Sequence, residues 1–441
     1  MMTNNYKPFI GGVPVSIERL AAELRCLGHE VYIFAPSYEG EEKEEYVIRY
    51  HSLKHKARGE YIIPNVLDPV IEKTFATLLF DLIHVHHPML IGYVARYLGR
   101  KYNVPVILTY HTRYEHYLHY LKLFGKRGTS AAMRSPEPAS QGRRLLTTGA
   151  AKVVTAHNRW FINGCDLVFA PSASMKEYLL EQGIVTDMEV IPTGLQKEEF
   201  EYDPIEADRL RRQYAKDSPY LFCSVSRLEK EKNIEFLLKG LKYFKERKGD
   251  CFKMLLIGEG GLRPVLEKLT AELGLENNII FCRSIPHEQL RNYYHACDAF
   301  LFASTSETQG IVLLEAMAAG LPVVAVRASG VRDVIVDGQN GYCTEEEIGA
   351  WTAKLIKLSE NEAIAGAMGR KAKEDALGYL SARIAKAVQK SYQNVLYRRR
   401  MEPEYEYQNN YPVASRIISL VPEIDIADRY FGIKSPGKSE K

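Results

Sequence analysis

Two glutamates of the chain, Glu307 and Glu315, border a segment with the composition of a phosphate-binding loop. A short apolar run, 299–303, leads into small polar residues and then into an apolar helical pattern. The N–H groups at the start of such a helix lie at the positive end of the helix dipole, which attracts anionic phosphate. We therefore expect four consecutive residues to face a phosphate-containing ligand: Thr308, Gln309, Gly310 and Ile311.

The spacing of the two glutamates indicates a different role for their side chains. Eight residues make about two helical turns, so Glu307 and Glu315 can face one ligand. Carboxylates repel phosphate, which suggests that they accept hydrogen bonds from hydroxyl groups. A sugar nucleotide offers both phosphates and hydroxyls. The alternative is that Glu307 only complements the helix dipole and Glu315 is a solvated helix residue.

Two cations and two glycines follow neighbouring strand-like segments. Arg227 and Lys232 come just after 221–225, at the kind of strand end where ligands of open α/β sheets bind. They would neutralise a diphosphate, or else they are surface charges at a helix start. Gly258 and Gly260 would let the backbone approach a nucleotide, but they do not complete a dinucleotide-binding fingerprint, because its sixth position is not glycine.

Three residues of the first half are further candidates for a site. Gly11 and Gly12 form a permissive loop, whose default interpretation is a tight turn without a ligand. His111 follows the strand-like segment 104–109 and so lies at the carboxyl edge of a sheet, where it is either an active-site group or a structural histidine.

The segment 113–144 is basic and rich in aromatic residues. It contains seven cations and two anions, whereas the whole chain has a formal net charge of +3. Aromatic residues beside cations suit the headgroup region of an anionic membrane. They would also suit single-stranded nucleic acid, and an amphipathic helix packed on its own domain is a further alternative. The expected membrane or acceptor contacts are Arg113, Tyr114, Tyr117, Tyr120, Lys122, Phe124, Lys126 and Arg127.

Length and composition show what kind of fold positions these groups. The 441 residues, 46% hydrophobic and 26% charged, are typical of a globular protein of two or three domains. The small net charge excludes a wholesale nucleic-acid binder. Short apolar runs alternate with helical patterns, which predicts βα units and parallel sheets. We expect strands at 31–34, 82–85, 104–109, 167–170, 190–192, 221–225, 254–257, 279–281, 299–303 and 323–326.

These units predict an α/β protein with two doubly wound, Rossmann-like domains. A glycine turn followed by charged residues near residue 200 predicts a linker. Only three residues precede the first polar run, so either the first strand is very short or the natural start lies upstream. The expected parts are a first domain over 1–200, a second over 201–378, a helix over 379–400 and an appendage over 401–441.

Other patterns concern compartment and cofactors. The seven cysteines form no C-x-x-C pair and are typical of reduced thiols. The sequence shows no secretory signal and no run of about 18 apolar residues, so we expect a cytoplasmic location. It also contains no D-x-D motif, the usual carboxylate pair that holds a divalent cation against a diphosphate, and we therefore expect metal-independent chemistry.

Taken together, the glycine loops, the strand-end histidine, the cation pair and the glutamates eight positions apart resemble the retaining glycosyltransferases of family 4. The resemblance covers about residues 3–400, with further landmarks at 165–172 and 190–194. It implies the GT-B fold, in which two Rossmann-like domains face a cleft and a C-terminal helix returns to the first domain. It implies no cofactor beyond the nucleotide-sugar donor.

The resemblance assigns roles on the second domain. Arg227 and Lys232 would hold the donor diphosphate, and Glu315 would hold the ribose. Glu307, with the backbone of 308–311, would bind the transferred sugar.

It assigns further roles around the cleft. Gly11, Gly12 and His111 would face the donor from the first domain. Ser284 lies in the expected base-binding loop, where Arg283 stands at a position that is often glycine in the family.

The stretch 109–117 is similar to the subgroup that glucosylates diacylglycerol in bacterial membranes. This similarity implies a UDP-glucose donor, a glycerolipid acceptor and a peripheral position on the inner face of the cell membrane, without a nucleic-acid partner. The alternatives are a transferase with a soluble or polysaccharide acceptor, a non-catalytic membrane or nucleic-acid adaptor, and a nicotinamide oxidoreductase.

Overall fold

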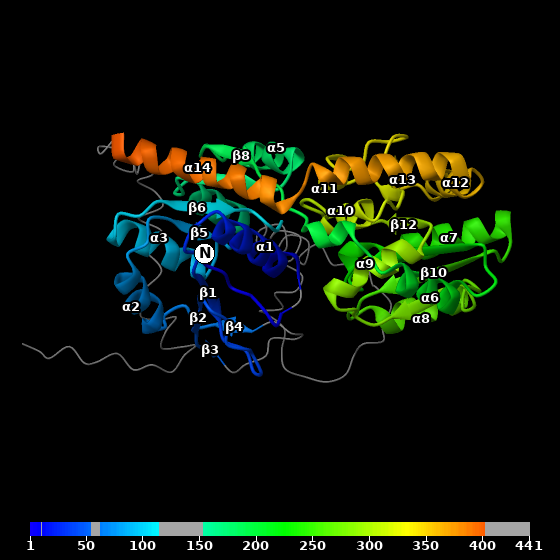
Figure 1. Ribbon diagram of the computed structural model, residues 1–441, viewed down its shortest axis with the longest axis horizontal. Helices are drawn as coiled ribbons and strands as arrows, with labels where there is room; N and C mark the ends of the chain where they lie inside the picture. Colours follow the sequence, from blue (N-terminus) through cyan, green and yellow to red (C-terminus); the bar gives the residue numbers. More distant parts are fainter. Residues whose placement is uncertain (10, 54–61, 114–152, 402–441) are drawn as a thin grey trace, which may run out of the picture.

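The computed structural model describes residues 1–9, 11–53, 62–113 and 153–401. Two sheets, each flanked by helices, lie one after the other along the long axis of the molecule (Figure 1). The first is built from residues up to 190 and the second from residues 220–344. The α/β class and the two Rossmann-like units agree with the prediction.

The first sheet has the strand order β2-β1-Met2-β5-β6-β7-β8. Met2 makes parallel bridges to Phe34 and Val85 and takes the place of a central strand, as expected if the first strand is very short. The strands are β1 Ile33–Pro36, β2 Val47–Tyr50, β5 Ile83–Val85, β6 Val106–Thr109, β7 Leu167–Ala170 and β8 Met188–Val190, beside a hairpin of β3 Ser52–Leu53 and β4 Ile63–Pro64. The helices are α1 Gly12–Cys26, α2 Pro69–Leu78, α3 Ile91–Lys101, a helix over 153–162 and α5 Ala173–Glu181.

The second sheet is fully parallel, with the order β11-β10-β9-β12-β13-β14. Its strands are β9 Tyr220–Val225, β10 Phe252–Ile257, β11 Ile279–Cys282, β12 Ala299–Phe302, β13 Val323–Val326 and β14 Gly341–Thr344. Its helices are η2 Lys197–Phe200, α6 Pro204–Ala215, η3 Lys230–Lys232, α7 Ile234–Lys248, α8 Arg263–Glu272, α9 His287–Ala296, α10 Ile311–Ala318, α11 Ser329–Arg332, α12 Ile348–Ser359 and α13 Glu362–Leu377.

In both sheets the strand order reverses beside the first strand, between Met2 and β5 and between β9 and β12. The loops that leave two neighbouring strands at such a switch point diverge, and ligands of open α/β sheets bind there. The fold therefore places two switch points in one molecule.

Polar side chains mark several helix starts. Ser172 caps α5 by accepting a hydrogen bond from the N–H of Met175. Asp203 caps α6 directly before Pro204, whose fixed backbone suits the first helical position. These caps fix where the chain leaves β7 and where the second unit begins.

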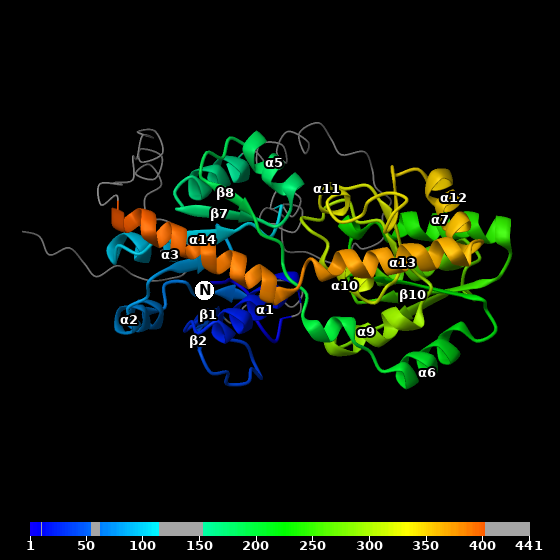
Figure 2. The same ribbon diagram turned by 45° about the horizontal axis from the view of Figure 1, so that its top comes forward.

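The last described helix, α14 (Ser381–Met401), crosses from the second unit back over the first (Figure 2). Its residues Ala385, Val388 and Val395 pack in one core with Ile17 of α1 and Phe169 of β7. The returning helix expected from the resemblance is thus present.

All ten expected strands are found, with ends shifted by a few residues. Two parallel strands, β2 and β14, were missed, because each has only four residues and neither begins with a long apolar run. Among the described residues, no helix is both long and apolar enough to cross a bilayer.

Candidate functional site

The switch point of the second sheet brings the predicted cations and one glutamate together. Lys232, at the end of η3, donates to Glu307 Oε1 across 2.5 Å, and Arg227 pairs with Glu231 at 2.9 Å. Burial raises the pKa of Glu307, but the charge and hydrogen bond of Lys232 outweigh it, so the net shift is downward. Glu307 is therefore a carboxylate at neutral pH. Its alternative role, as a partner of the helix dipole alone, does not account for its ion pair with Lys232.

The loop after β12 ends in the N-terminus of α10, and the N-terminus of α1 meets it. Gly310 precedes α10 with φ of 78°, a left-handed conformation that favours glycine. Gly12 is the first residue of α1, and a Cβ placed on it would lie 3.5 Å from Cδ1 of Ile311. Two helix N-termini, one from each unit, thus converge on one region, which concentrates positive potential for an anion.

His111 approaches the same loop from the first sheet. It follows β6 by two residues, and its carbonyl accepts a hydrogen bond from Thr308 Oγ1 at 2.9 Å. Ser172 Oγ in turn donates to the carbonyl of Thr308 at 2.8 Å. The sequence-predicted His111 therefore lies beside the predicted phosphate loop.

The side chain of Gln309 has a different role from the predicted substrate contact. Its Oε1 accepts from the N–H of Thr193 and its Nε2 donates to the carbonyl of the same residue, at 2.7 and 2.9 Å. Because both polar atoms of the amide are used, this side chain joins the loop to the interdomain connection. Its backbone lies just before Gly310, the residue that precedes α10, and packs closely against Gly330.

Glu315 lies in a buried network that links the two units. It is 6% exposed, so the alternative of a solvated helix residue is wrong. Its Oε1 accepts from Arg19 of α1 at 3.2 Å and from His287 Nε2 at 2.9 Å, and its Oε2 accepts from Tyr294. Arg19 also contacts Glu199 of η2, so one guanidinium joins α1, the connection and α10.

The ionisation of this network follows from its burial. Desolvation, reinforced by Glu315, raises the pKa of Glu199 to about 7 against the opposing charge of Arg19. The hydrogen bond to Glu315 raises the pKa of His287. The ligand atoms of Glu199, His287 and Glu315 lie within 4.8 Å of one another, the grouping that a metal ion would require. Arg19 Nη2 already contacts all three, so a cation of the chain itself stands there.

The glycines after β10 serve loop packing. A Cβ on Gly258 would lie 2.0 Å from the carbonyl oxygen of Ser226, and one on Gly260 would lie 2.4 Å from that of Leu228. The close approach predicted for a nucleotide is therefore made to the loop that carries Arg227. This packing explains both glycines without a ligand.

Other predicted residues are less central. Ser284 is exposed just after β11, and its neighbour Arg283 is exposed as well. Gly11 directly precedes α1 and has an extended backbone, with φ of 175°. The guanidinium of Arg113 lies over the ring of Tyr178 at 4.3 Å. The other expected membrane contacts lie outside the described residues: Tyr114, Tyr117, Tyr120, Lys122, Phe124, Lys126 and Arg127.

Sequence reasoning missed a cluster of histidines at the end of β5. His86 Nδ1 lies 2.8 Å from His111 Nε2, and the rings of His84 and His86 lie 4.3 Å apart. Desolvation lowers the pKa of His111 to about 3 and that of His87 to about 4, and the pKa values of His84 and His86 also fall. The H-x-H spacing in a strand, which puts both rings on one face, is the signal that could have revealed them.

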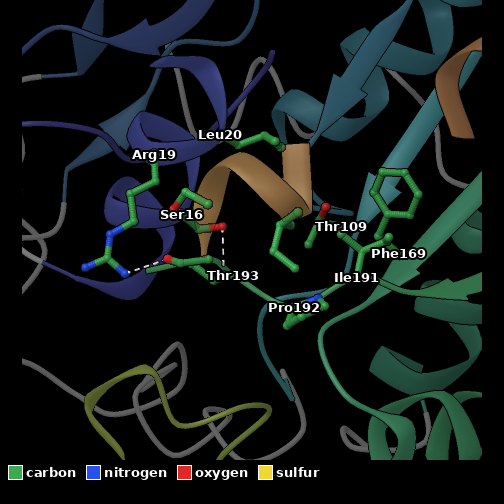
Figure 3. Close-up of a pocket in the computed structure, with 11 residues that line it drawn as sticks. Ser16, Arg19, Leu20, Thr109, Phe169, Ile191, Pro192 and Thr193 are labelled. Carbon is green, nitrogen blue, oxygen red and sulfur yellow. Dashed lines mark hydrogen bonds between the residues drawn. The ribbon is translucent and has the colours of Figure 1, made fainter. Parts of the chain in front are cut away.

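Figure 3 shows a small cavity behind these groups, where α1, the interdomain connection and the start of α14 meet. Arg19 points across it to the carbonyl of Gly194, and Thr193 Oγ1 donates to Ser16. Its volume of about 20 Å³ suits a water molecule. It lies at the interdomain connection and is too small for a substrate.

Known proteins resemble the chain over both units. The profile described as Glycosyltransferase Family 4 matches residues 10–199, and that described as Glycosyl transferases group 1 matches residues 206–375. The α-monoglucosyldiacylglycerol synthase of Streptococcus pneumoniae is 29% identical, over 81% of this chain and 78% of that protein. The enzyme of the same name from Acholeplasma laidlawii is 27% identical, over 89% and 95%.

The structure of HepE from Anabaena in complex with UDP-glucose superposes with a TM-score of 0.67 at 17% identity, over 89% of this chain and 99% of that one. This likeness supports the GT-B fold. The matches give no support to an oxidoreductase or to a non-catalytic adaptor. The chain belongs to the family 4 glycosyltransferases and is a glycosyltransferase enzyme of the GT-B fold.

Proposed function

We propose that this enzyme transfers glucose from UDP-glucose to a diacylglycerol-type membrane lipid, with retention of the anomeric configuration. The observation that carries the proposal is the convergence of the α1 and α10 N-termini beside the Lys232–Glu307 pair and His111. The names of the two synthases, and the UDP-glucose in the HepE complex, support the choice of acceptor and donor.

On this proposal the donor diphosphate lies between the helix N-termini, Arg227 and Lys232. Glu307 accepts hydrogen bonds from hydroxyls of the glucose, and His111 contacts the same sugar from the first domain. Gly11 and Gly12 keep the α1 N-terminus open to the ligand. In the complex, the ribose hydroxyls bind Glu315, displacing Arg19 or His287 from that carboxylate.

The proposed chemistry is front-face transfer. The C–O bond between the anomeric carbon and the diphosphate breaks while the acceptor hydroxyl forms a new bond on the same face. A phosphate oxygen of the leaving group takes the proton of that hydroxyl. Cations and oriented N–H groups stabilise the developing charge, an effect that is commonly worth a factor of about 100 to 1,000 per group.

We propose that this transfer needs no metal ion. Arg227, Lys232 and two helix N-termini supply positive charge at the site. The candidate ligand group at Glu199 already contacts the guanidinium of Arg19. Activity in the presence of a strong chelator is the direct measurement, and its loss and restoration by Mg²⁺ or Mn²⁺ would contradict this part of the proposal.

We propose that the enzyme acts as a peripheral protein on the inner face of the cell membrane, and one exposed face of α3 supports contact with a membrane. Leu90, Tyr93 and Tyr97 are 41%, 45% and 51% exposed, and Arg100 and Lys101 continue the same face one turn later, where Lys101 pairs with Glu72 of α2. Tyrosine rings next to cations are typical of the interface between headgroups and acyl chains. Arg113, the first residue of the basic segment 113–144, places its guanidinium over the ring of Tyr178.

The decisive experiment combines the full-length protein, radiolabelled UDP-glucose and vesicles of phosphatidylglycerol that contain diacylglycerol. We expect organic-phase label in a glucosyl diacylglycerol whose linkage is cleaved by an α-glucosidase. Glu307→Gln is the inactive control. Label that enters only water-soluble glycans would show that the acceptor is soluble or polymeric, and a strong preference for GDP-glucose would overturn the donor.

Co-sedimentation with the same vesicles tests the α3 face. Tyr93→Ser combined with Tyr97→Ser should weaken vesicle binding about 10-fold, because two interfacial rings are lost. Tyr243→Ser, an exposed tyrosine of α7 in the second unit, is the matched control and should bind as the wild type does. Equal losses in both variants would mean that α3 is not the membrane face.

A further inference from the structure

The ring of His111 is held by a second histidine. The backbone of His111 is fixed on both sides, because the N–H of Tyr110 donates to Phe169 and the carbonyl of His111 accepts from Thr308. These bonds leave the rotation of the ring free. Within the part of the chain that the structure describes, the ring makes one hydrogen bond, which joins His111 Nε2 to His86 Nδ1 at 2.8 Å, with the rings stacked at 5.1 Å.

The two rings are neutral, so one proton lies on the line between these nitrogens. Neutral imidazole has one donor and one acceptor nitrogen, and the pair allows two arrangements. Either His86 donates from Nδ1 and His111 carries its proton on Nδ1, or His111 donates from Nε2 and His86 carries its proton on Nε2.

The surroundings of His86 distinguish the two arrangements. His86 Nε2 is buried and has no hydrogen-bond partner among the described residues. A buried N–H without an acceptor is rarer in proteins than an acceptor without a donor. The proton of His86 therefore belongs on Nδ1, where His111 accepts it.

Packing holds the His86 ring in this position. The ring of His84 lies on it at 4.3 Å, and both nitrogens of His84 are occupied by Tyr392 of α14 and Thr109 of β6, each at 2.6 Å. The N–H of His86 donates to the carbonyl of Met2 in the sheet. The strand, the ring of His84 and helix α14 thus hold the His86 ring so that its Nδ1 faces His111 Nε2.

We propose that His86 is a positioning residue that fixes His111 as the Nδ1–H tautomer, so that His111 presents a hydrogen-bond donor to a hydroxyl of the transferred sugar. His111 acts in this state as a donor and not as a base. The inference rests on the proposed placement of the sugar beside His111 and adds the residue that orients the ring.

The tautomer is measured without any turnover. A long-range ¹⁵N–¹H spectrum of the full-length protein with ¹⁵N-labelled histidine separates protonated from unprotonated ring nitrogens, and His111→Asn assigns the signals. We expect His111 with a protonated Nδ1 and an unprotonated Nε2 in the wild type. In His86→Leu the ring should show a mixture of tautomers. A protonated Nε2 of His111 in the wild type would overturn the proposal.

Kinetics with UDP-glucose and diacylglycerol vesicles supply the second readout. His86→Leu should lower kcat/KM about 10-fold, mainly through kcat, as expected for a lost orienting hydrogen bond. His86→Asn should recover to within about threefold of the wild type, because the amide nitrogen of asparagine takes the position of Nδ1. Folding of each variant is checked by thermal unfolding.

The matched control is His84→Leu, two residues away on the same strand face and equally buried. Because leucine still fills the space beside the His86 ring, this variant should lower stability while reducing kcat/KM much less than His86→Leu does and leaving His111 mainly as the Nδ1–H tautomer. If His84→Leu and His86→Leu reduce the rate equally, or if asparagine gives no recovery, the role of His86 is general packing and the proposal fails. If the wild type shows the predicted tautomer but transfers no glucose, the proposed function fails instead.

Discussion

The polar groups at the two switch points of this enzyme differ in charge state: those of the first sheet are neutral, and those of the second are ionised. At the end of the first sheet, His84, His86 and His111 lie ring against ring and are neutral, because desolvation lowers their pKa values. At the end of the second sheet, Lys232 and Glu307 are both charged and neutralise each other. On the proposed function, the donor side would meet a charged ligand with ions, whereas the other side would orient sugar hydroxyls with neutral groups.

The comparison also has consequences for stability. A neutral buried histidine costs free energy when solvent is acidic enough to protonate the unfolded chain, whereas an ion pair loses its energy only when its carboxylate is protonated. The network around Arg19, which joins the two sheets, behaves in the opposite sense, since burial raises the pKa of Glu199.

The largest expected effect is the acid sensitivity of the first sheet. The folded pKa values of His87 and His111, about 4 and about 3, lie below the ordinary value of 6.5. Below pH 6.5 the unfolded chain therefore binds a proton that the folded histidine does not, and stability falls by about 2 kcal/mol for each histidine between pH 6.5 and pH 5. Hydrogen exchange at these two pH values, corrected for the intrinsic rates, should show greater loss of protection in β5 and β6 than in β9 and β12. Equal losses in both sheets would contradict the comparison.

Removing the guanidinium between the sheets should have the next largest effect. Arg19→Met leaves Glu199 and Glu315 buried without their cation and should lower the free energy of unfolding by about 3 kcal/mol. Because the folded pKa of Glu199 is raised, the native state binds more protons than the unfolded state between about pH 4.5 and 7, and stability falls as pH rises through that window. The loss in Arg19→Met should therefore be larger at pH 8 than at pH 6.

The control for this variant lies on the same helix. Arg25→Met removes a guanidinium of α1 whose hydrogen bonds, among the described residues, go to the carbonyl of Val31 and not to a carboxylate. Urea unfolding should show a smaller loss without the increase at pH 8. If Arg19→Met were no more destabilising at pH 8 than at pH 6, the raised pKa of Glu199 would be wrong.

The ion pair of the second sheet is expected to matter for catalysis more than for stability. Lys232→Ala should lower kcat/KM about 100- to 1,000-fold, because a cation is lost where the diphosphate charge develops. Lys230→Ala removes a charge from the same turn, where the side chain is exposed, and should leave the rate almost unchanged. Comparable losses in the two variants would reduce Lys232 to a contributor of general positive potential.

The smallest expected effect concerns the two hydrogen bonds between the Gln309 side chain and the backbone of Thr193. Gln309→Ala leaves the N–H and carbonyl of Thr193 without their partner and should cost about 1–2 kcal/mol of stability. It should also raise KM for the nucleotide sugar, since the loop before α10 loses its hydrogen bonds to the interdomain connection. Gln289→Ala removes an exposed amide of α9 and is the control. Urea unfolding and the KM for the nucleotide sugar, measured for both variants, should change in Gln309→Ala and not in Gln289→Ala.

Much of the fold could be predicted because local sequence patterns determine it. Apolar runs of four to six residues form β6, β9 and β12, and short-range glycine and polar signals mark the loops that leave them. The places of His111, Glu307 and Lys232 at strand ends follow from these runs alone. The strands β2 and β14 were missed because four residues without a strong apolar pattern depend on their neighbours for their pairing.

The partners of these residues could not be predicted. Arg19 and Glu315 are 296 positions apart, and Gln309 and Thr193 are 116 apart, so no periodicity in the sequence relates them. Gly258 and Gly260 illustrate the same limit, because the sequence shows that a backbone comes close there but not that the backbone belongs to the chain itself.

The sequence by itself thus determined the two doubly wound units, the strand ends where the candidate site residues lie and the kinds of group available there, since these depend on short-range pattern and side-chain chemistry. Only the tertiary structure decided which groups are ionised and which partner each one has. The physical reason is that burial and contact between the two units set the pKa values and the hydrogen bonds, and both arise when distant segments pack. The pairing of His86 with His111 exists only because β5 and β6 are neighbours in the folded sheet.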